Sequence, residues 1–364
     1  MAREPQLYFD NNATAPLRPV AVTAIQDAMG PPANPSSVHG YGRAARMAVE
    51  AARAGIAILA GCRGADVVFT SGGTEANNLV LSAFDHVITS AVEHDSMLRA
   101  APGATLVGVD ADGRIDLDQL REALKALPDN RRKSTLVSVM HANNETGVIQ
   151  PIGDVVALAQ DAGVATHSDM VQMLGKRHLD FSSSGLDYAS LSAHKIGGPT
   201  GVGALLVRPG MRMTSLLRGG GQEQGRRSGT ENVLGIIGFG AAAKAAFDDV
   251  PHYRAMAVWR DRLETRLTAG RNDVRLFGAT ADRIANTACL AIDQKSAETM
   301  VMALDLAGVA ISAGSACSSG KVHESHVLKA MGAGEDAGRA IRISGGWNTE
   351  EADFEKLAEV LLAL

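Results

Sequence analysis

The feature that most constrains the fold of this chain is a regular alternation of short apolar runs, rich in β-branched residues, with segments of helical periodicity. Amphipathic segments such as Leu117–Leu127 and Ile152–Ala162 lie between several of the runs. This order is typical of βαβ units and predicts an α/β fold with a mostly parallel sheet and helices on both faces. The expected strands are Val67–Thr70, His86–Thr89, Thr105–Val109, Leu136–Met140, Val164–His167, Tyr188–Leu191 and Gly203–Val207.

The last third of the chain has a different pattern. A long helical stretch over residues 231–267 is broken near Pro251. Strands are then expected at Thr287–Ile292, Val309–Ser312 and Ala340–Ile343, and helices at Ala297–Leu306, Ser325–Met331 and Thr349–Leu362. We interpret this part as a smaller α+β domain. We therefore expect a large domain over residues 15–250 and a small domain formed by residues 1–14 and 251–364.

Composition excludes several classes of protein. The net charge of −5 provides no basic surface for nucleic acid. No apolar run approaches the length of a membrane helix, and the first residues lack a signal-peptide pattern, so we expect a cytoplasmic protein without a membrane partner. The three cysteines, Cys62, Cys289 and Cys317, are odd in number and far apart, which excludes a disulfide framework and a Cys-pair zinc site.

A lysine and an aspartate follow two of the expected strands. Lys195 lies in Ser192–Pro199, among small and polar residues that suit a desolvated amine able to form an imine. Asp169 precedes it by 26 residues. Pyridoxal phosphate needs a carboxylate at its pyridine nitrogen and a lysine for attachment, and this pair has the order for both. A solvated loop lysine and a helix-capping aspartate are the alternative interpretations.

A glycine-rich junction follows the strand expected at Val67–Thr70. Ser71–Thr74 leads from that strand into a helical pattern, and such a junction offers backbone N–H groups to a phosphate. It lacks the lysine and spacing of a P-loop, so a nucleotide is not expected. Composition alone assigns the polar clusters His141–Gly147 and Gly219–Thr230 to surface loops.

Cys317 differs from the other two cysteines in its neighbours. It lies in Ser312–Gly320, a run of small residues in which nothing large can bury a thiol. A nucleophilic thiol requires such an open setting, although most free cysteines are inert small hydrophobes. Cys289, inside an apolar strand, and Cys62 are expected to be inert. For Cys317 the residues alone leave a reactive and an inert thiol equally open.

These clusters together resemble the cysteine desulfurases, pyridoxal-phosphate enzymes of fold type I in the class V aminotransferase family. The resemblance covers nearly the whole chain, to Ser344, with the motifs in family order. It is closest to the group whose cysteine loop is long and mobile. The matching segments are Asp10–Thr14, Asn34–Ser37, Glu93–His94, Asn143–Gly147, Gln150–Ile152, Ser192–Pro199, Arg227–Thr230, Gly314–Gly320 and Ser325–Leu328.

The resemblance implies a role for each matched residue. The catalytic residues would be Lys195, which holds the cofactor and moves the Cα proton, His94, which stacks on the ring, and Cys317, which receives the sulfur. Asp169 would pair with the ring nitrogen and Gln172 with its phenolic oxygen. The phosphate-binding residues would be Gly73, Thr74, Ser192, His194 and, from the partner subunit, Thr230. The substrate-binding residues would be Arg342, Asn144, which also touches the cofactor, and Asn12.

The implied reaction removes sulfur from L-cysteine and gives L-alanine and a persulfide on Cys317. The sulfur would pass to an acceptor protein or small thiol for iron–sulfur clusters or other sulfur-containing cofactors. The resemblance also implies a homodimer and no metal site, apart from Cys317 as a transient iron–sulfur ligand. A transaminase or lyase with a bystander Cys317, and a catalytically silent binding partner, are the alternatives.

Two departures from the family pattern stand out. Thr200 occupies a position where many relatives have lysine, next to the expected cofactor loop. The chain also ends at Leu364, whereas relatives that bind a cluster scaffold often continue further. We therefore expect weak scaffold binding through the usual surface.

Overall fold

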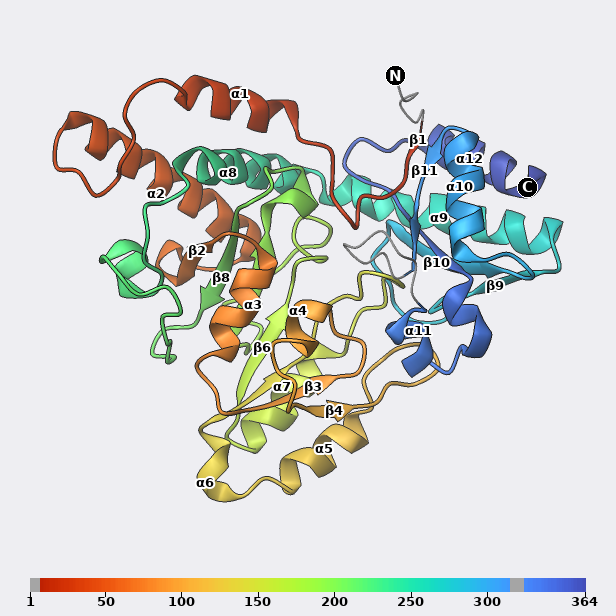
Figure 1. Cartoon of the computed structure of the whole chain (residues 1–364), viewed down its shortest axis with the longest axis horizontal. Coiled ribbons are helices and arrows are strands. Elements are labelled where there is room, and N and C mark those ends of the chain that lie inside the picture. The colour runs from red at the N-terminus through yellow and green to blue at the C-terminus, as the bar shows by residue number, and fades with distance from the viewer. Residues whose placement is uncertain (1–6, 315–323) are drawn as a thin grey trace.

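The computed structural model describes residues 7–314 and 324–364 (Figure 1). Its largest sheet has seven strands in the order β2-β8-β7-β6-β5-β3-β4, and only β8 runs antiparallel to its neighbours. The expected α/β fold with a mostly parallel sheet is therefore confirmed. The strands are β2 (Val67–Thr70), β3 (His86–Ser90), β4 (Thr105–Val107), β5 (Thr135–Ser138), β6 (Ala165–Asp169), β7 (Tyr188–Ser192) and β8 (Gly203–Val207).

Helices cover both faces of this sheet, so both faces are buried. Successive side chains of a strand point to opposite sides and therefore enter different cores. Val67 and Phe69 pack into one core, and Val68 between them packs into the core on the other face. On the first face lie α1 (Pro19–Ala28), α2 (Gly40–Ala60), α5 (Leu117–Lys125), α7 (Ile152–Asp161) and α8 (Val233–Asp248). On the second face lie α3 (Gly73–Leu81) and α4 (Asp95–Leu98). The short α6 (Asp129–Arg132) buries no residue.

Helix α8 packs closely against α1 and α2. A Cβ atom at Gly240 would lie 2.6 Å from Ala52, and one at Gly238 would lie 2.7 Å from Ile25. Glycine at these two positions therefore allows the helix axes to approach each other. Most of the helix is apolar because the sheet and the two helices cover it, and its charged residues, Lys244 and Asp248, are exposed near its end.

The C-terminal part forms a second, antiparallel sheet with its own core. The strand order is β12-β13-β10-β9, and β1 pairs with β11 in a separate parallel ladder. These strands are β1 (Leu7–Tyr8), β9 (Val274–Leu276), β10 (Thr287–Ile292), β11 (Val309–Ala310), β12 (Ser312–Ala313) and β13 (Ala340–Ser344). The helices are α9 (Val250–Gly270), α10 (Ala297–Leu306), α11 (His326–Ala330) and α12 (Glu351–Ala363). Single 3-10 turns lie at η1 (Gly64–Asp66), η3 (Gln222–Gly225) and η4 (Gly334–Gly338).

The expected strand Val309–Ser312 was wrong in detail. Residues 309–313 form two short strands, because the chain changes its pairing partner from β1 to β13 at Ile311. The expected break in the long helical stretch is confirmed, since α8 ends at Asp248 and α9 begins at Val250. Pro251 lies in the first turn of α9, where its missing N–H costs nothing. The domain boundary at residue 250 stays a prediction.

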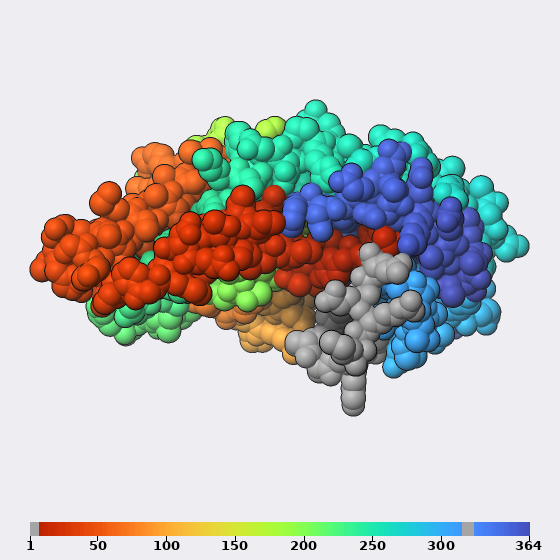
Figure 2. Space-filling view, turned by 90° about the horizontal axis from the view of Figure 1, so that it is seen from above, coloured from red at the N-terminus to blue at the C-terminus, as the bar shows by residue number. Residues whose placement is uncertain are grey.

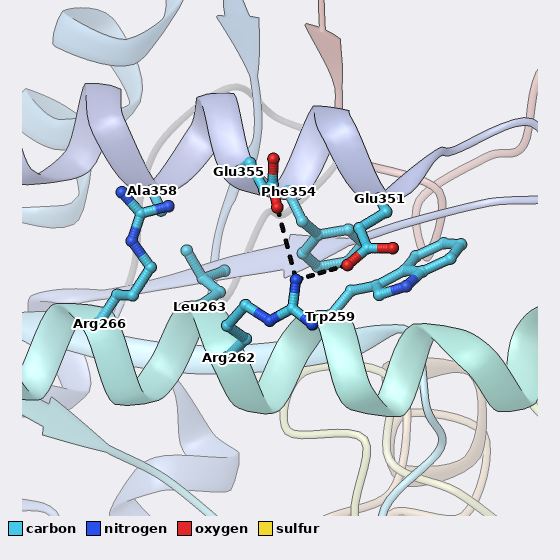
Figure 3. Close-up of a pocket in the computed structure, with 8 residues that line it drawn as sticks. All are labelled: Trp259, Arg262, Leu263, Arg266, Glu351, Phe354, Glu355 and Ala358. Atoms are coloured by element: carbon cyan, nitrogen blue, oxygen red, sulfur yellow. Dashed lines mark hydrogen bonds and ion pairs between the residues drawn. The ribbon is translucent and has the colours of Figure 1, made fainter.

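Helices α9 and α12 enclose a narrow crevice in the C-terminal part (Figure 3). Arg262 from α9 forms ion pairs with Glu351 at 2.5 Å and Glu355 at 3.4 Å on α12. The rings of Trp259 and Phe354 lie 6.1 Å apart beside them. These contacts join the two helices, and we assign this crevice a structural role.

The N-terminal segment connects the two sheets. Figure 2 shows it in red, meeting C-terminal residues in blue. Trp347 Nε1 donates to the main-chain oxygen of Pro16 at 2.9 Å, and the Arg18 guanidinium lies 5.0 Å from the Trp347 ring centre. Over residues 7–314 and 324–364, no helix has the length and apolar character needed to cross a bilayer.

Candidate active site

Polar residues at the carboxyl ends of the parallel strands surround one cavity. Asp169 and Ser192 are the last residues of β6 and β7, and Met140 follows β5. Ligands of open parallel sheets bind at this edge, since the loops there diverge. The cavity is lined by Asn12, Ala13, Gly73, Thr74, His94, Ser96, Met140, Asn144, Asp169, Val171, Gln172, Ser192, His194, Lys195 and Arg342.

Lys195 lies on a 3-10 turn, η2 (Ala193–Ile196), directly after β7. Its Nζ donates hydrogen bonds to the main-chain oxygens of Asn12 at 2.5 Å and Ala13 at 2.8 Å. Burial lowers the pKa of this amine to about 8, and the positive charge of Arg342 adds to the effect. The neutral form, which a nucleophile requires, is therefore much more populated near physiological pH than in an ordinary lysine.

Both carboxylate oxygens of Asp169 accept hydrogen bonds. The Val171 N–H donates to Oδ1 at 3.0 Å, and Asn77 Nδ2 donates to Oδ2 at 2.8 Å. Asp169 is 7% exposed. These donors orient the carboxylate before any ligand binds.

His94 caps α4 at the mouth of the cavity. The Ser96 N–H donates to His94 Nδ1 at 3.1 Å, and Ser96 Oγ lies 2.8 Å from the same nitrogen. Because Nδ1 accepts from the backbone, the neutral ring carries its proton on Nε2. Burial lowers the pKa of His94, and the charge of Lys195 lowers it further, against the opposing charge of Asp169.

The glycine-rich junction forms the start of α3, which begins at Gly73. The N–H groups of a first helical turn have no partner within the helix and favour an anion. A Cβ atom at Gly73 would lie 2.9 Å from Val171 Cγ2, so glycine keeps this corner open. His194, whose pKa is lowered to about 4 by burial and by the charge of Lys195, also lines the cavity.

Thr230 is not part of this cavity. It is exposed and lines a separate crevice with Ser71, Gly201 and Arg227. Arg227 forms an ion pair with Glu75 of α3 at 2.8 Å, so the loop that carries Thr230 is held against the start of α3. The expected contribution of Thr230 to a neighbouring subunit stays a prediction.

Arg342 reaches the cavity from β13. Its Nη2 donates to Asp10 Oδ1 at 2.7 Å and its Nη1 to the main-chain oxygen of Asn144 at 3.3 Å. Its Nε is buried and has no hydrogen-bond partner within the described residues. A buried donor without a partner is costly, and an anionic ligand would satisfy it.

Asn12 faces the cavity mainly with its main-chain oxygen. Its Nδ2 donates to the main-chain oxygen of Asn144 at 3.1 Å and to Thr287 Oγ1 at 2.9 Å. Its Oδ1 accepts from Lys176 at 2.9 Å and Asn286 at 3.2 Å. The side-chain amide is therefore already engaged, and direct binding of substrate through it stays a prediction.

Cys317 lies outside the described residues. The strand that precedes it, β12, pairs with β13 so that Ser312 is the register partner of Arg342. After it, buried Ser325 donates to Glu145 Oε2 at 2.5 Å. Burial raises the pKa of that carboxyl to about 7. The described chain on both sides of Cys317 is thus fixed near the Arg342 side of the cavity.

The other two thiols are held in their neutral form. Burial raises the pKa of Cys62 to about 12, and the negative charge of Asp66 contributes. Burial also raises the pKa of Cys289, which is fully buried in β10. Neither thiol is a nucleophile near neutral pH, because the thiolate is the reactive form.

Sequence reasoning missed the residues that hold the cavity side chains in place. These residues are Asn77 behind Asp169, Ser96 beside His94, and Asp10 against Arg342. One signal was present for Asn77, which lies three residues after Thr74 and therefore on the same face of α3. The Asp10–Arg342 pair spans 332 residues and left no local signal.

Comparison with known proteins agrees with this geometry. The family model described as aminotransferase class-V matches residues 7–357. A curated cysteine desulfurase of Cereibacter sphaeroides is 41% identical, over 98% of this chain and 95% of its own length. The crystal structure of a NifS-like protein from Rickettsia africae superposes with a TM-score of 0.91 at 34% identity, over 98% of this chain and 99% of that one. A structure titled SspA in complex with cysteine superposes with a TM-score of 0.77 at 30% identity, over 93% and 98%.

The fold and the cavity therefore define a class V aminotransferase, and the chain belongs to that family. Within the family it belongs with the cysteine desulfurases.

Proposed function

We propose that this protein is a cysteine desulfurase that uses pyridoxal 5'-phosphate to take the sulfur atom from L-cysteine. The observation that carries the proposal is the convergence of Lys195, Asp169, His94 and Arg342 on one cavity. The strand that leads to Cys317 lies beside that cavity.

The residues of the cavity fit pyridoxal phosphate. A lysine amine of lowered pKa is available for covalent attachment, and an oriented carboxylate is available for the pyridine nitrogen. The open corner at Gly73 and the first N–H groups of α3 suit the phosphate, with Thr74, Ser192 and His194 beside it. When bound, the cofactor supplies an electron sink for the substrate carbon.

Arg342 and Asn144 are the residues we assign to the substrate. The unpartnered Nε of Arg342 is a donor for the carboxylate of an amino acid, and Asp10 holds the guanidinium in place from the other side. The structural relative titled SspA in complex with cysteine is a protein that binds cysteine.

In the sulfur-transfer step, the Cys317 thiolate forms a bond with the substrate sulfur as the substrate Cβ–S bond breaks. The bonding electron pair stays with carbon, which gains a proton and leaves as L-alanine. Cys317 then carries a persulfide. Lys195 moves the Cα proton, since its amine changes protonation state near pH 8. His94, which lines the same cavity, would lie against the bound cofactor and would act as acid and base.

We assign the active enzyme as a cytoplasmic homodimer in which Thr230 of one subunit completes the phosphate site of the other. The exposed position of Thr230, outside its own cavity, supports this assignment. The sulfur acceptor would be a protein or a small thiol, and iron–sulfur or other sulfur-containing cofactors would be the end use.

One experiment tests the proposal against a transaminase with a bystander thiol. The protein is incubated with L-cysteine alone, and alanine and protein-bound sulfane sulfur are assayed together. A desulfurase releases alanine and gains sulfane sulfur in equal amounts before an added thiol removes it. Turnover that depends on a keto acid, without protein-bound sulfur, would disprove the assignment.

A further inference from the structure

Lys176 is a buried amine directly behind the cavity. It is 3% exposed, and its Nζ donates to Gln172 Oε1 at 2.8 Å and to Asn12 Oδ1 at 2.9 Å. In the described part of the chain no ion pair joins this amine to a carboxylate. Burying an ammonium group without an opposite charge is unfavourable, so its retention here calls for a role beyond packing.

The two contacts determine which way two amides point. A side-chain amide presents either its oxygen or its NH₂ group to a neighbour. Lys176 offers hydrogens to both amides, and even a neutral amine has two N–H bonds for the two oxygens. Gln172 therefore turns Oε1 toward Lys176 and Nε2 toward the cavity side, where Nε2 also donates to the main-chain oxygen of Asn12 at 3.0 Å.

Asn12 is oriented by the same amine. Lys176 and Asn286 both donate to its Oδ1, which directs its Nδ2 to the oxygens of Asn144 and Thr287. The main-chain oxygen of Asn12 is then the group that accepts from Lys195. One buried amine thus supports both the Gln172 amide and the backbone on which Lys195 rests.

We propose that Lys176 is a positioning residue that keeps the Gln172 amide turned with its N–H donor toward bound pyridoxal phosphate. This inference rests on the proposed function, because it concerns the same cavity. Lys176 does not touch the substrate, and its effect passes through Gln172. Its chemical consequence is a hydrogen-bond donor, in place of an acceptor, for an ionised oxygen of the cofactor.

The charge distribution supports this assignment. Burial lowers the pKa of Lys176 well below its usual range, and the charges of Lys195 and Arg342 lower it further. These causes favour the neutral amine, whose N–H bonds still hold the Gln172 amide in place. An N–H donor from Gln172 favours a deprotonated ligand group, so its loss moves a ligand titration to higher pH.

The test is a spectrophotometric pH titration of the purified, cofactor-loaded protein. In Lys176→Met the Gln172 amide can turn over and present its oxygen. The pH midpoint of the visible absorption change should then rise by about one unit. Gln172→Leu should raise it similarly, and the double variant should not exceed Gln172→Leu alone, because both changes remove one shared contact. Arg283→Met is the matched control, since it removes a buried cation that pairs with Glu264 away from the cavity.

A lower melting temperature with an unchanged midpoint in Lys176→Met would show that Lys176 only stabilises the fold, and would overturn the proposal. If that variant does not fold, Lys176→Gln replaces it. The new amide can still donate to the buried oxygens, but it can also turn its own oxygen toward Gln172, which frees the Gln172 amide to turn over. The pH midpoint should therefore still rise, and an unchanged midpoint would contradict the proposal. A wild-type protein without any bound chromophore would instead refute the proposed function.

Discussion

Asn77 Nδ2 donates to Asp169 Oδ2 at 2.8 Å, and the Val171 N–H donates to the other carboxylate oxygen at 3.0 Å. Asn77 is itself fully buried, and its amide also donates to Ser96 Oγ at 2.8 Å. Ser96 in turn contacts the ring of His94. One asparagine on α3 therefore links the carboxylate that we assign to the ring nitrogen with the histidine that we assign to the ring face.

Replacing this asparagine should weaken cofactor binding. Asn77→Ala removes a charge-assisted hydrogen bond worth about 1.5–3 kcal/mol, which corresponds to roughly a ten- to hundred-fold higher dissociation constant. Titration of the stripped protein with pyridoxal phosphate, followed by fluorescence, measures this. Asn78→Ala is the control, because the Asn78 amide donates only to main-chain oxygens. Equal affinities of the two variants would contradict the role of Asn77.

The lowered pKa of Lys195 predicts how cofactor loading depends on pH. Only the neutral amine attacks an aldehyde, so the loading rate should rise through about pH 8 and level off above it. An ordinary lysine would reach this plateau only above its usual pKa of 10.5. Stopped-flow absorbance on protein freed of cofactor provides the measurement.

Arg342→Met tests whether the charge of Arg342 contributes to the lowered pKa of Lys195. Burial is the main cause of the lowered pKa of Lys195, and the charge of Arg342 is the second. Removing this charge raises the pKa, so the midpoint of loading should move to higher pH while remaining below 10.5. A shift to lower pH would contradict the electrostatic assignment.

The attachment residue can be identified chemically. Borohydride reduction of the yellow protein should fix the cofactor on Lys195, and Lys195→Ala should lose both the covalent adduct and turnover. Lys176 is the internal control, because its amine is buried behind Gln172. Peptide mapping that places the adduct on Lys176, or on any other lysine, refutes the assignment.

The sequence predicted the strands of the large sheet well, but it predicted poorly which side chains hold the site residues in place. β2, β8 and β10 match their expected bounds because each is a continuous buried run between turn residues. β1 and β9 were missed, since a strand of two or three residues has too few positions to show a period.

The same contrast holds for the site. Lys195 and Asp169 each end or follow a strand, so strand order alone places them at one edge. Contacts such as Asp10 with Arg342 depend on how two distant segments pack, and side-chain spacing cannot indicate them. Lys176 was missed for a different reason: a lone lysine is ordinarily solvated, and its burial is a tertiary effect.

The proposed homodimer makes Thr230 a residue of the neighbouring site. Thr230→Val should leave the dimer intact in light scattering but weaken cofactor binding by about 1.5–3 kcal/mol, the cost of one charge-assisted phosphate hydrogen bond. Thr214→Val, at another exposed threonine, is the matched control. A wild-type monomer with full cofactor occupancy would contradict a shared site.

The last prediction concerns the three thiols. Cys317→Ser keeps the size of the side chain, but a hydroxyl does not ionise near neutral pH and cannot carry a persulfide. The variant should therefore bind pyridoxal phosphate and L-cysteine, accumulate early spectral changes, and release almost no alanine. Stopped-flow spectra with an alanine assay distinguish these steps.

Cys62→Ser and Cys289→Ser are the matched controls, and the structure gives the reason. Burial raises the pKa of Cys62 to about 12 and moves that of Cys289 upward as well, so neither supplies a thiolate to accept sulfur. Both variants should keep most of the activity. Cys289→Ser should lose stability by about 1–3 kcal/mol, because it places a hydroxyl in the fully buried strand β10. If Cys317→Ser releases alanine from cysteine near the wild-type rate, another group accepts the sulfur and the proposed mechanism is wrong.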